Sequence, residues 1–140
     1  MTTEYRFHHL ALVATKFDET VTWYQRHFGF TVAKEWTVPE MLPGARMCYL
    51  QRGTMFLEII GDGTKVGHHL VTAGPLEDYQ VTGFRHVAFE VDDVDAAMTE
   101  LASAGVAPFF PPTDIPAVGI RAALVRDPEG NTVELIQWLP

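Results

Sequence analysis

Four side chains that could bind a metal recur at matching positions in the two halves of the chain. His9 precedes Glu58 by 49 residues, and His86 precedes Glu134 by 48. Each glutamate lies in an apolar run, where an ionised carboxylate is costly unless a cation or hydrogen-bond donors meet it. Imidazole and carboxylate ligands together suit zinc, nickel, cobalt, manganese or ferrous iron. If the halves pack with pseudo-twofold symmetry, the four side chains converge on one concavity and bind one divalent ion.

The segments that carry these residues are themselves repeated. Residues 7–13 align with residues 84–90 at an offset of 77, and residues 56–60 align with residues 132–136 at an offset of 76. Each half therefore begins with a histidine and closes with a glutamate, so the repeat covers most of the chain.

Strand parity places the two histidines on equivalent faces. The opening segments alternate in the manner of a strand, whose successive side chains point to opposite faces. In the first copy the more apolar face carries Leu10 and Leu12, and we expect it to lie under a helix. His9 and His86 then point to the opposite face, and the small alanine two positions after each of them leaves room for a ligand.

The periodicity predicts an α+β fold of two tandem βαβββ modules that form a curved mixed sheet around a metal-binding cavity. We expect one domain over residues 1–140, with module one at about 5–61, a linker at about 62–82 and module two at about 83–140. His68 and His69 in this linker are expected to lie in a solvated loop.

Helices and strands follow from the pattern within each module. In module one, Asp18 caps a helix that Gly29 ends, and the predicted strands are 7–13, 30–36, 46–51 and 55–60. In module two, Asp92 or Asp93 caps a helix that Gly105 ends, a proline-rich loop covers 108–116, and the predicted strands are 85–91, 120–126 and 132–138.

Composition excludes several kinds of partner. The chain has 140 residues, 47% of them apolar, and a formal charge of −8 with only ten Lys and Arg. Nucleic acid and anionic membranes need positive charge, so neither is an expected partner. No apolar run approaches the roughly 20 residues of a membrane span, and no leader pattern begins the chain, so we expect a cytoplasmic protein. Cys48 is the only cysteine and is expected to be a small apolar residue.

The chain resembles the vicinal oxygen chelate superfamily, which includes glyoxalase I, methylmalonyl-CoA epimerase, extradiol dioxygenases and metal-free bleomycin-binding proteins. The resemblance spans nearly the whole chain and rests on these segments: His9-Leu10-Ala11-Leu12, Phe28-Gly29-Phe30, His86-Val87-Ala88-Phe89, Asp127-Pro128-Glu129-Gly130-Asn131 and Val133-Glu134-Leu135. The superfamily keeps its scaffold while it changes its chemistry, so these segments predict the fold more strongly than the substrate.

The resemblance implies a metal-dependent, glyoxalase-like lyase or isomerase that acts on a small molecule. Two His and two Glu are similar to the glyoxalase I ligand set, with Glu134 or Glu58 as the base that moves a proton between adjacent carbons. The alternatives are a ferrous extradiol-type dioxygenase, for which Glu58 would be an excess anion, and a metal-free protein that binds and sequesters a drug or metabolite. The resemblance and the exposed sheet edges imply a homodimer.

Three arginines could hold an anionic part of the substrate. Arg46, Arg121 and Arg126 all lie on predicted strands, where they are equally compatible with ordinary exposed side chains.

Overall fold

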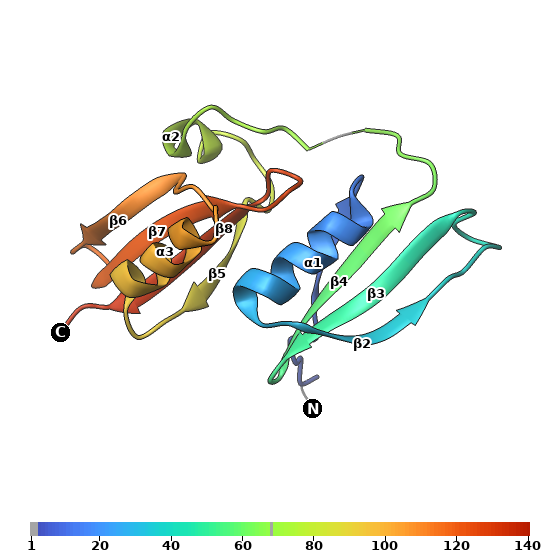
Figure 1. Cartoon of the computed structure of the whole chain (residues 1–140), viewed down its shortest axis with the longest axis horizontal. Helices are drawn as coiled ribbons and strands as arrows, with labels where there is room; N and C mark the ends of the chain where they lie inside the picture. Colours follow the sequence, from blue (N-terminus) through green and yellow to red (C-terminus); the bar gives the residue numbers. More distant parts are fainter. Residues whose placement is uncertain (1–2, 68) are drawn as a thin grey trace. The chain divides into compact units, whose positions relative to one another are not determined.

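The computed structural model describes residues 3–67 and 69–140, and each of these two ranges forms a compact unit. Each unit contains a four-stranded mixed sheet with one long helix, as Figure 1 shows. The predicted α+β class is therefore confirmed. Among the described residues, no helix is both long and apolar enough to cross a membrane.

The first unit has the predicted βαβββ order. Its sheet follows the order β1-β4-β3-β2, with β1 parallel to β4 and the other pairs antiparallel. The elements are β1 (Leu10–Ala14), α1 (Phe17–Phe28), β2 (Thr31–Trp36), β3 (Ala45–Arg52) and β4 (Met55–Asp62). β1 begins three residues later than predicted, so His9 lies immediately before it.

Helix α1 covers one face of this sheet. Alternate residues of β3 and β4 are buried on that face, namely Cys48, Leu50, Leu57 and Ile59. Gly61 belongs to the same series, and the first residue of α1, Phe17, packs directly on it. Glu58 has the opposite parity, so its carboxylate is on the face that α1 leaves free.

The predicted cap of α1 is wrong. The helix begins at Phe17, and Lys16 is the N-cap residue with no side-chain cap bond. Asp18 lies instead in the first turn, where its carboxylate pairs with Arg46 at 2.9 Å, and the same guanidinium pairs with Asp62 at 2.5 Å. The Asp18 carboxylate, which the local pattern assigns to the helix cap, is thus bound by Arg46, a residue of the sheet that is distant in sequence. Gly29 ends the helix as predicted, with a left-handed φ of 67°.

The second unit repeats this topology. Its sheet follows the order β5-β8-β7-β6, and β5 is parallel to β8. The elements are α2 (Pro75–Asp78), β5 (His86–Glu90), α3 (Val94–Ser103), β6 (Phe110–Ile115), β7 (Ile120–Arg126) and β8 (Thr132–Trp138).

Two elements of this unit lie where the local sequence pattern predicts none, although the βαβββ repeat requires a strand between α3 and β7. β6 occupies the proline-rich segment that we expect to be a loop, and it pairs with β7 as an edge strand with a register shift between Phe110 and Thr113. Pro111 and Pro112 fall within that shift, where the lack of an N–H donor costs no ladder bond. The short helix α2 lies within the predicted linker. His68 is outside the described residues, while His69 Nε2 lies 3.3 Å from the Gly130 carbonyl oxygen.

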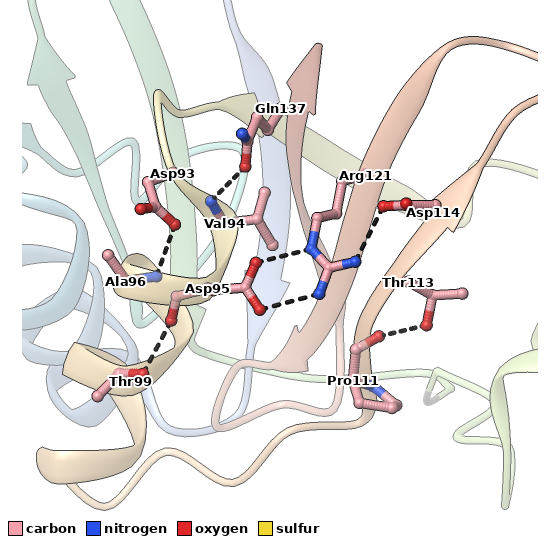
Figure 2. Close-up of polar contacts among 10 residues, drawn as sticks. All are labelled: Asp93, Val94, Asp95, Ala96, Thr99, Pro111, Thr113, Asp114, Arg121 and Gln137. Atoms are coloured by element: carbon pink, nitrogen blue, oxygen red, sulfur yellow. Dashed lines mark hydrogen bonds and ion pairs between the residues drawn. The ribbon is translucent and has the colours of Figure 1, made fainter. Parts of the chain in front are cut away.

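Helix α3 is fixed at its N-terminus by three side chains, which Figure 2 shows. Asp93 is the N-cap, as one of the two predicted candidates, and accepts a bond from the Ala96 N–H at 2.9 Å. Gln137 Oε1 accepts from the Val94 N–H at 3.0 Å. Arg121 binds Asp95 of the first turn and Asp114 of β6, at 2.7 and 2.9 Å. Arg46 makes the equivalent contact with Asp18 of α1 in the first unit, so the repeat extends to the attachment of each helix, although the second partner of Arg46, Asp62, lies on β4.

Candidate metal centre

The first unit brings His9 and Glu58 together. His9 Nε2 lies 2.9 Å from Glu58 Oε2, and the two side chains are 30% and 15% exposed. Glu58 pairs across the parallel ladder with Ala11, whose methyl group leaves the space that the carboxylate and imidazole occupy. The half-buried pair therefore presents one nitrogen and one carboxylate on the face opposite α1.

His8 and two aromatic rings hold the His9 ring in this orientation. His8 Nδ1 lies 2.7 Å from His9 Nδ1, and the His8 ring stacks on Phe56 with centroids 5.6 Å apart. The Tyr49 ring lies edge-on to His9 at 5.4 Å. Metal-ligating histidines almost always make a hydrogen bond at the second ring nitrogen, commonly to a carboxylate, backbone carbonyl or water, and here the partner of that nitrogen is the His8 imidazole. His8 was not predicted to belong to the site, although its place beside His9 was the available indication.

The second unit forms the same pair. His86 Nε2 lies 2.9 Å from Glu134 Oε2, with side chains 26% and 12% exposed, and Glu134 pairs across the ladder with Ala88. The hydrogen bond from Glu134 raises the pKa of His86 above its ordinary value, against the opposing effect of burial. The two pairs thus agree in residue types, register and distance.

Glu134 also lines a cavity of about 420 Å³ in the second unit. Tyr79, immediately after α2, lies on this cavity and places its ring edge-on to His86 with centroids 5.9 Å apart. Burial and the nearby charges of Glu134 and Asp78 raise the pKa of the Tyr79 hydroxyl, so it stays protonated at neutral pH. Tyr79 was not predicted because it falls in a segment without periodicity.

Each pair has a spacing that suits two ligands of one ion. Metal–nitrogen and metal–oxygen bonds of about 2.0–2.2 Å, set at a right angle, separate the two donor atoms by about 3 Å. Both observed separations are 2.9 Å. Each pair lies within its own unit, and within residues 3–67 and 69–140 no three His, Cys, Asp or Glu side chains group closely enough to hold an ion. The convergence of all four ligands remains a prediction.

The other candidate residues are occupied or buried. Arg46 and Arg121 each bind two aspartates, and Arg126 donates to the Thr72 carbonyl oxygen while it lies over the Phe109 ring. Cys48 is buried under α1, and this burial, with the charge of Glu35, raises its pKa to about 11. Its thiol is therefore protonated at neutral pH and unsuited to act as a nucleophile.

A buried ion pair attaches α2 to the second sheet. Arg85 donates to Asp78 Oδ1 at 2.6 Å, and the Thr72 hydroxyl donates to the same oxygen at 3.2 Å. The Asp78 side chain is only 5% exposed. Burial alone would raise the pKa of Asp78, but the hydrogen bonds from Arg85 and Thr72 and the charges of Arg85 and Arg126 outweigh it and leave the pKa below its ordinary value.

We expect Asp78→Asn to lower the free energy of unfolding by about 2 kcal/mol at pH 7, because Arg85 loses its buried partner. A carboxylate whose folded pKa is lowered stabilises the fold above its unfolded pKa of about 3.9, and this stability disappears as pH falls through the folded value. The difference from the parent should therefore shrink below about pH 4. Urea unfolding from pH 7 to pH 3 measures it, with Glu77→Gln as the matched control on α2. An equal difference at every pH would contradict the assignment.

The chain belongs to the glyoxalase/bleomycin resistance protein/dioxygenase superfamily, whose family model matches residues 6–135. The "Uncharacterized protein YwkD" of Bacillus subtilis is 28% identical over 133 residues, which cover 93% of this chain and 94% of that protein. The "Putative lactoylglutathione lyase" of Brassica oleracea var. gemmifera is 27% identical over 136 residues. The glyoxalase family protein of Enterococcus faecalis superposes with a TM-score of 0.77 at 25% identity, covering 94% of this chain and 97% of that one.

This chain is shorter than the curated relatives whose names state an activity. The alignment covers 96% of this chain but 45% of the Brassica protein. A 55-residue stretch is 42% identical to a glyoxylase-named protein of Mycobacterium tuberculosis, and covers 39% of this chain and 21% of that protein.

Proposed function

We propose that the protein is a metal-dependent lyase or isomerase that transfers a proton between neighbouring carbons of a small molecule. The observation that carries this proposal is the matched pair of His–Glu contacts, His9 with Glu58 and His86 with Glu134, each at 2.9 Å. Two half-buried histidines, each meeting a largely buried glutamate, occur at equivalent places in both repeats. Packing alone does not require such a repeat, whereas one shared divalent ion with four ligands explains both copies.

In this proposal the four side chains hold one ion of zinc, nickel, cobalt, manganese or iron. Such an ion, when bound, would polarise two neighbouring substrate oxygens and so make the hydrogen on the adjoining carbon more acidic. His9 and His86 supply neutral nitrogen ligands, and Glu58 and Glu134 balance the charge of the ion. The total charge of the occupied centre is then close to zero.

Glu134 is the side chain that we propose moves the proton. Its carboxylate lies on the cavity of the second unit, where a substrate could reach it, and is 12% exposed. For a 2-hydroxy ketone, the C–H bond beside the hydroxyl breaks, a Glu134 oxygen takes the proton and exchanges it with solvent, and the same oxygen returns a proton to the former carbonyl carbon. The hydroxyl proton passes to the other oxygen, so the substrate isomerises without an added reductant or oxidant.

The proposal is tested by hydrogen exchange in D₂O. The protein, purified without a chelator or affinity tag, is loaded with each of the five ions and incubated with 2-hydroxy aldehydes and 2-hydroxy ketones that carry aliphatic, aromatic or carboxylate substituents. Metal-dependent incorporation of deuterium at carbon supports the proposal. Oxygen consumption with catechols and ferrous iron, without exchange, would replace it with a ring-cleaving dioxygenase.

The cavity beside Glu134 favours one second candidate. A volume of about 420 Å³ lies within the roughly 300–1,000 Å³ of typical ligand sites, so a metal-free protein could use it to sequester a small molecule. Tight binding of a compound by chelator-treated protein, without turnover under any metal, would establish that function instead.

A further inference from the structure

The cavity of the second unit, which we name the α2 pocket, has apolar walls. It lies between the α2 segment and the sheet face that carries Glu134. Apart from Glu77 and Glu134, all of its lining residues are apolar or aromatic, among them Leu76, Tyr79, Phe110, Ile115, Ala122 and Leu124. Ala122 and Leu124 come from β7 and are 3% and 4% exposed, so the floor of the pocket is part of a packed sheet.

The ionisable groups on the α2 pocket are acidic. Glu77 and Glu134 are its only lining carboxylates in the described part of the chain, and the lining residues include no Lys, Arg or His. A carboxylate or phosphate in this pocket would be desolvated beside two negative groups, which costs several kcal/mol without a cation to meet it.

No arginine of this unit is available to supply that cation. Residues 69–140 contain only three basic residues other than His, namely Arg85, Arg121 and Arg126. Arg85 is bound to Asp78, and Arg121 is bound to both Asp95 and Asp114. Arg126 donates to Thr72 and lies 3.6 Å from the centroid of the Phe109 ring. Releasing any of them would break a contact that holds α2, β6 or α3 to the sheet.

We infer that the α2 pocket takes an uncharged apolar group of the substrate, aromatic or branched aliphatic, and rejects anionic groups. This inference deepens the proposed function, on which it rests, because Glu134, the base in that proposal, lines the α2 pocket. The ring of Phe110 and the ring of Tyr79 supply apolar surface for such a group, and the Tyr79 hydroxyl supplies a donor at its edge. A substrate whose α2-pocket group is a peptide carboxylate or a nucleotide phosphate is thereby excluded.

The test compares two probes of one shape on metal-free protein. Benzyl alcohol and benzoate are titrated separately into ¹⁵N-labelled protein, and amide shifts are followed at Tyr79, Ala122 and Leu124. We expect saturable shifts with benzyl alcohol and binding weaker by about tenfold or more with benzoate. The Leu76→Lys variant adds a cation on an exposed position of α2 and should reduce or reverse this preference. Leu70→Lys, exposed but not part of the pocket, should leave it unchanged.

Equal or tighter binding of benzoate to the parent protein would overturn the inference, as would benzyl alcohol shifts confined to residues outside the pocket. Because the probes are measured without metal, failure of the proposed function has a different result: no divalent ion binds and no exchange occurs, while the preference between the two probes persists. Metal-dependent exchange that is faster with carboxylate-bearing substrates than with aromatic ones would retain the proposed function and reject the inference.

Discussion

The Glu58→Gln, Glu134→Gln double variant is expected to purify without divalent metal, whereas the parent protein holds about one ion per chain. Glutamine keeps the shape of glutamate but removes the negative charge and the stronger ligand oxygen, so a site of two His and two neutral amides loses most of its affinity. We expect the affinity to fall by more than about 100-fold, which exceeds the effect of changing a residue that only supports a ligand. Elemental mass spectrometry of protein purified without a chelator measures the stoichiometry.

Matched controls separate loss of ligands from loss of charge. Glu35→Gln and Glu90→Gln each remove one carboxylate from an exposed strand position, one in each unit, and together they change the net charge as the double variant does. The metal content of this control should equal that of the parent. An absence of metal in the parent, even after it is soaked with each ion, would contradict the centre, as would a double variant that keeps its ion.

Mixing the two single variants shows whether one chain or two build the centre. If the first unit of one chain meets the second unit of its partner, a dimer of Glu58→Gln with Glu134→Gln has one intact centre and one centre without glutamates. Co-refolded mixtures should then bind more metal than either variant binds alone. If each chain builds its own centre, mixing recovers nothing. Analytical ultracentrifugation of the parent tests the homodimer itself.

Turnover should depend strongly on the Glu134 carboxylate. We expect Glu134→Gln to lower metal-dependent deuterium exchange by about 10²- to 10⁴-fold, the usual contribution of a positioned base. The residual metal content of the same sample is measured in parallel, so that loss of the base is distinguished from loss of the ion.

The internal repeat made the fold predictable from sequence and singled out the two histidines and the two glutamates. Local alternation assigned His9 and His86 to one kind of face, and the matched spacing marked one glutamate in each half. The structure places His9 beside Glu58 and His86 beside Glu134, each at 2.9 Å within its own unit, while the convergence of all four on one ion stays a prediction. The parity argument succeeded because the side-chain period of a strand is fixed, whatever the chain does elsewhere.

The elements and the helix cap that were predicted wrongly depend on contacts between residues distant in sequence. β6 contains Pro111 and Pro112, which local propensity assigns to a loop, yet an edge strand with a register shift accommodates them. The α2 segment has little periodicity and is held in place by the buried Asp78–Arg85 pair. Asp18 is a typical cap residue, but Arg46 on β3 takes its carboxylate. None of these partners is visible in a short window of sequence.

Gly61→Ala is expected to lower the free energy of unfolding by about 3 kcal/mol, the upper part of the range for inserting a methyl group into a packed site. A Cβ at Gly61 would lie 2.4 Å from the Cβ of Phe17 and 2.5 Å from its ring. Since the Phe17 Cβ is fixed by the backbone of α1, a change of rotamer does not relieve the contact, and the start of the helix must move. Urea unfolding measures the loss, and Gly67→Ala is the control, because a Cβ there meets nothing within 4 Å.

A second substitution identifies the origin of this loss. Phe17→Ala removes the ring but keeps the Cβ, so we expect Gly61→Ala to retain at least half of its effect in that background. Full rescue would show that only the ring obstructs the added methyl group. The second unit solves the same junction differently: Gln137, at the repeat position of Gly61, accepts a bond from the Val94 N–H at the start of α3. The first unit instead packs the Phe17 ring on the backbone of Gly61. Gly61 lies three residues after Glu58 on β4. We therefore expect the movement of α1 in the Gly61→Ala variant to weaken metal binding as well.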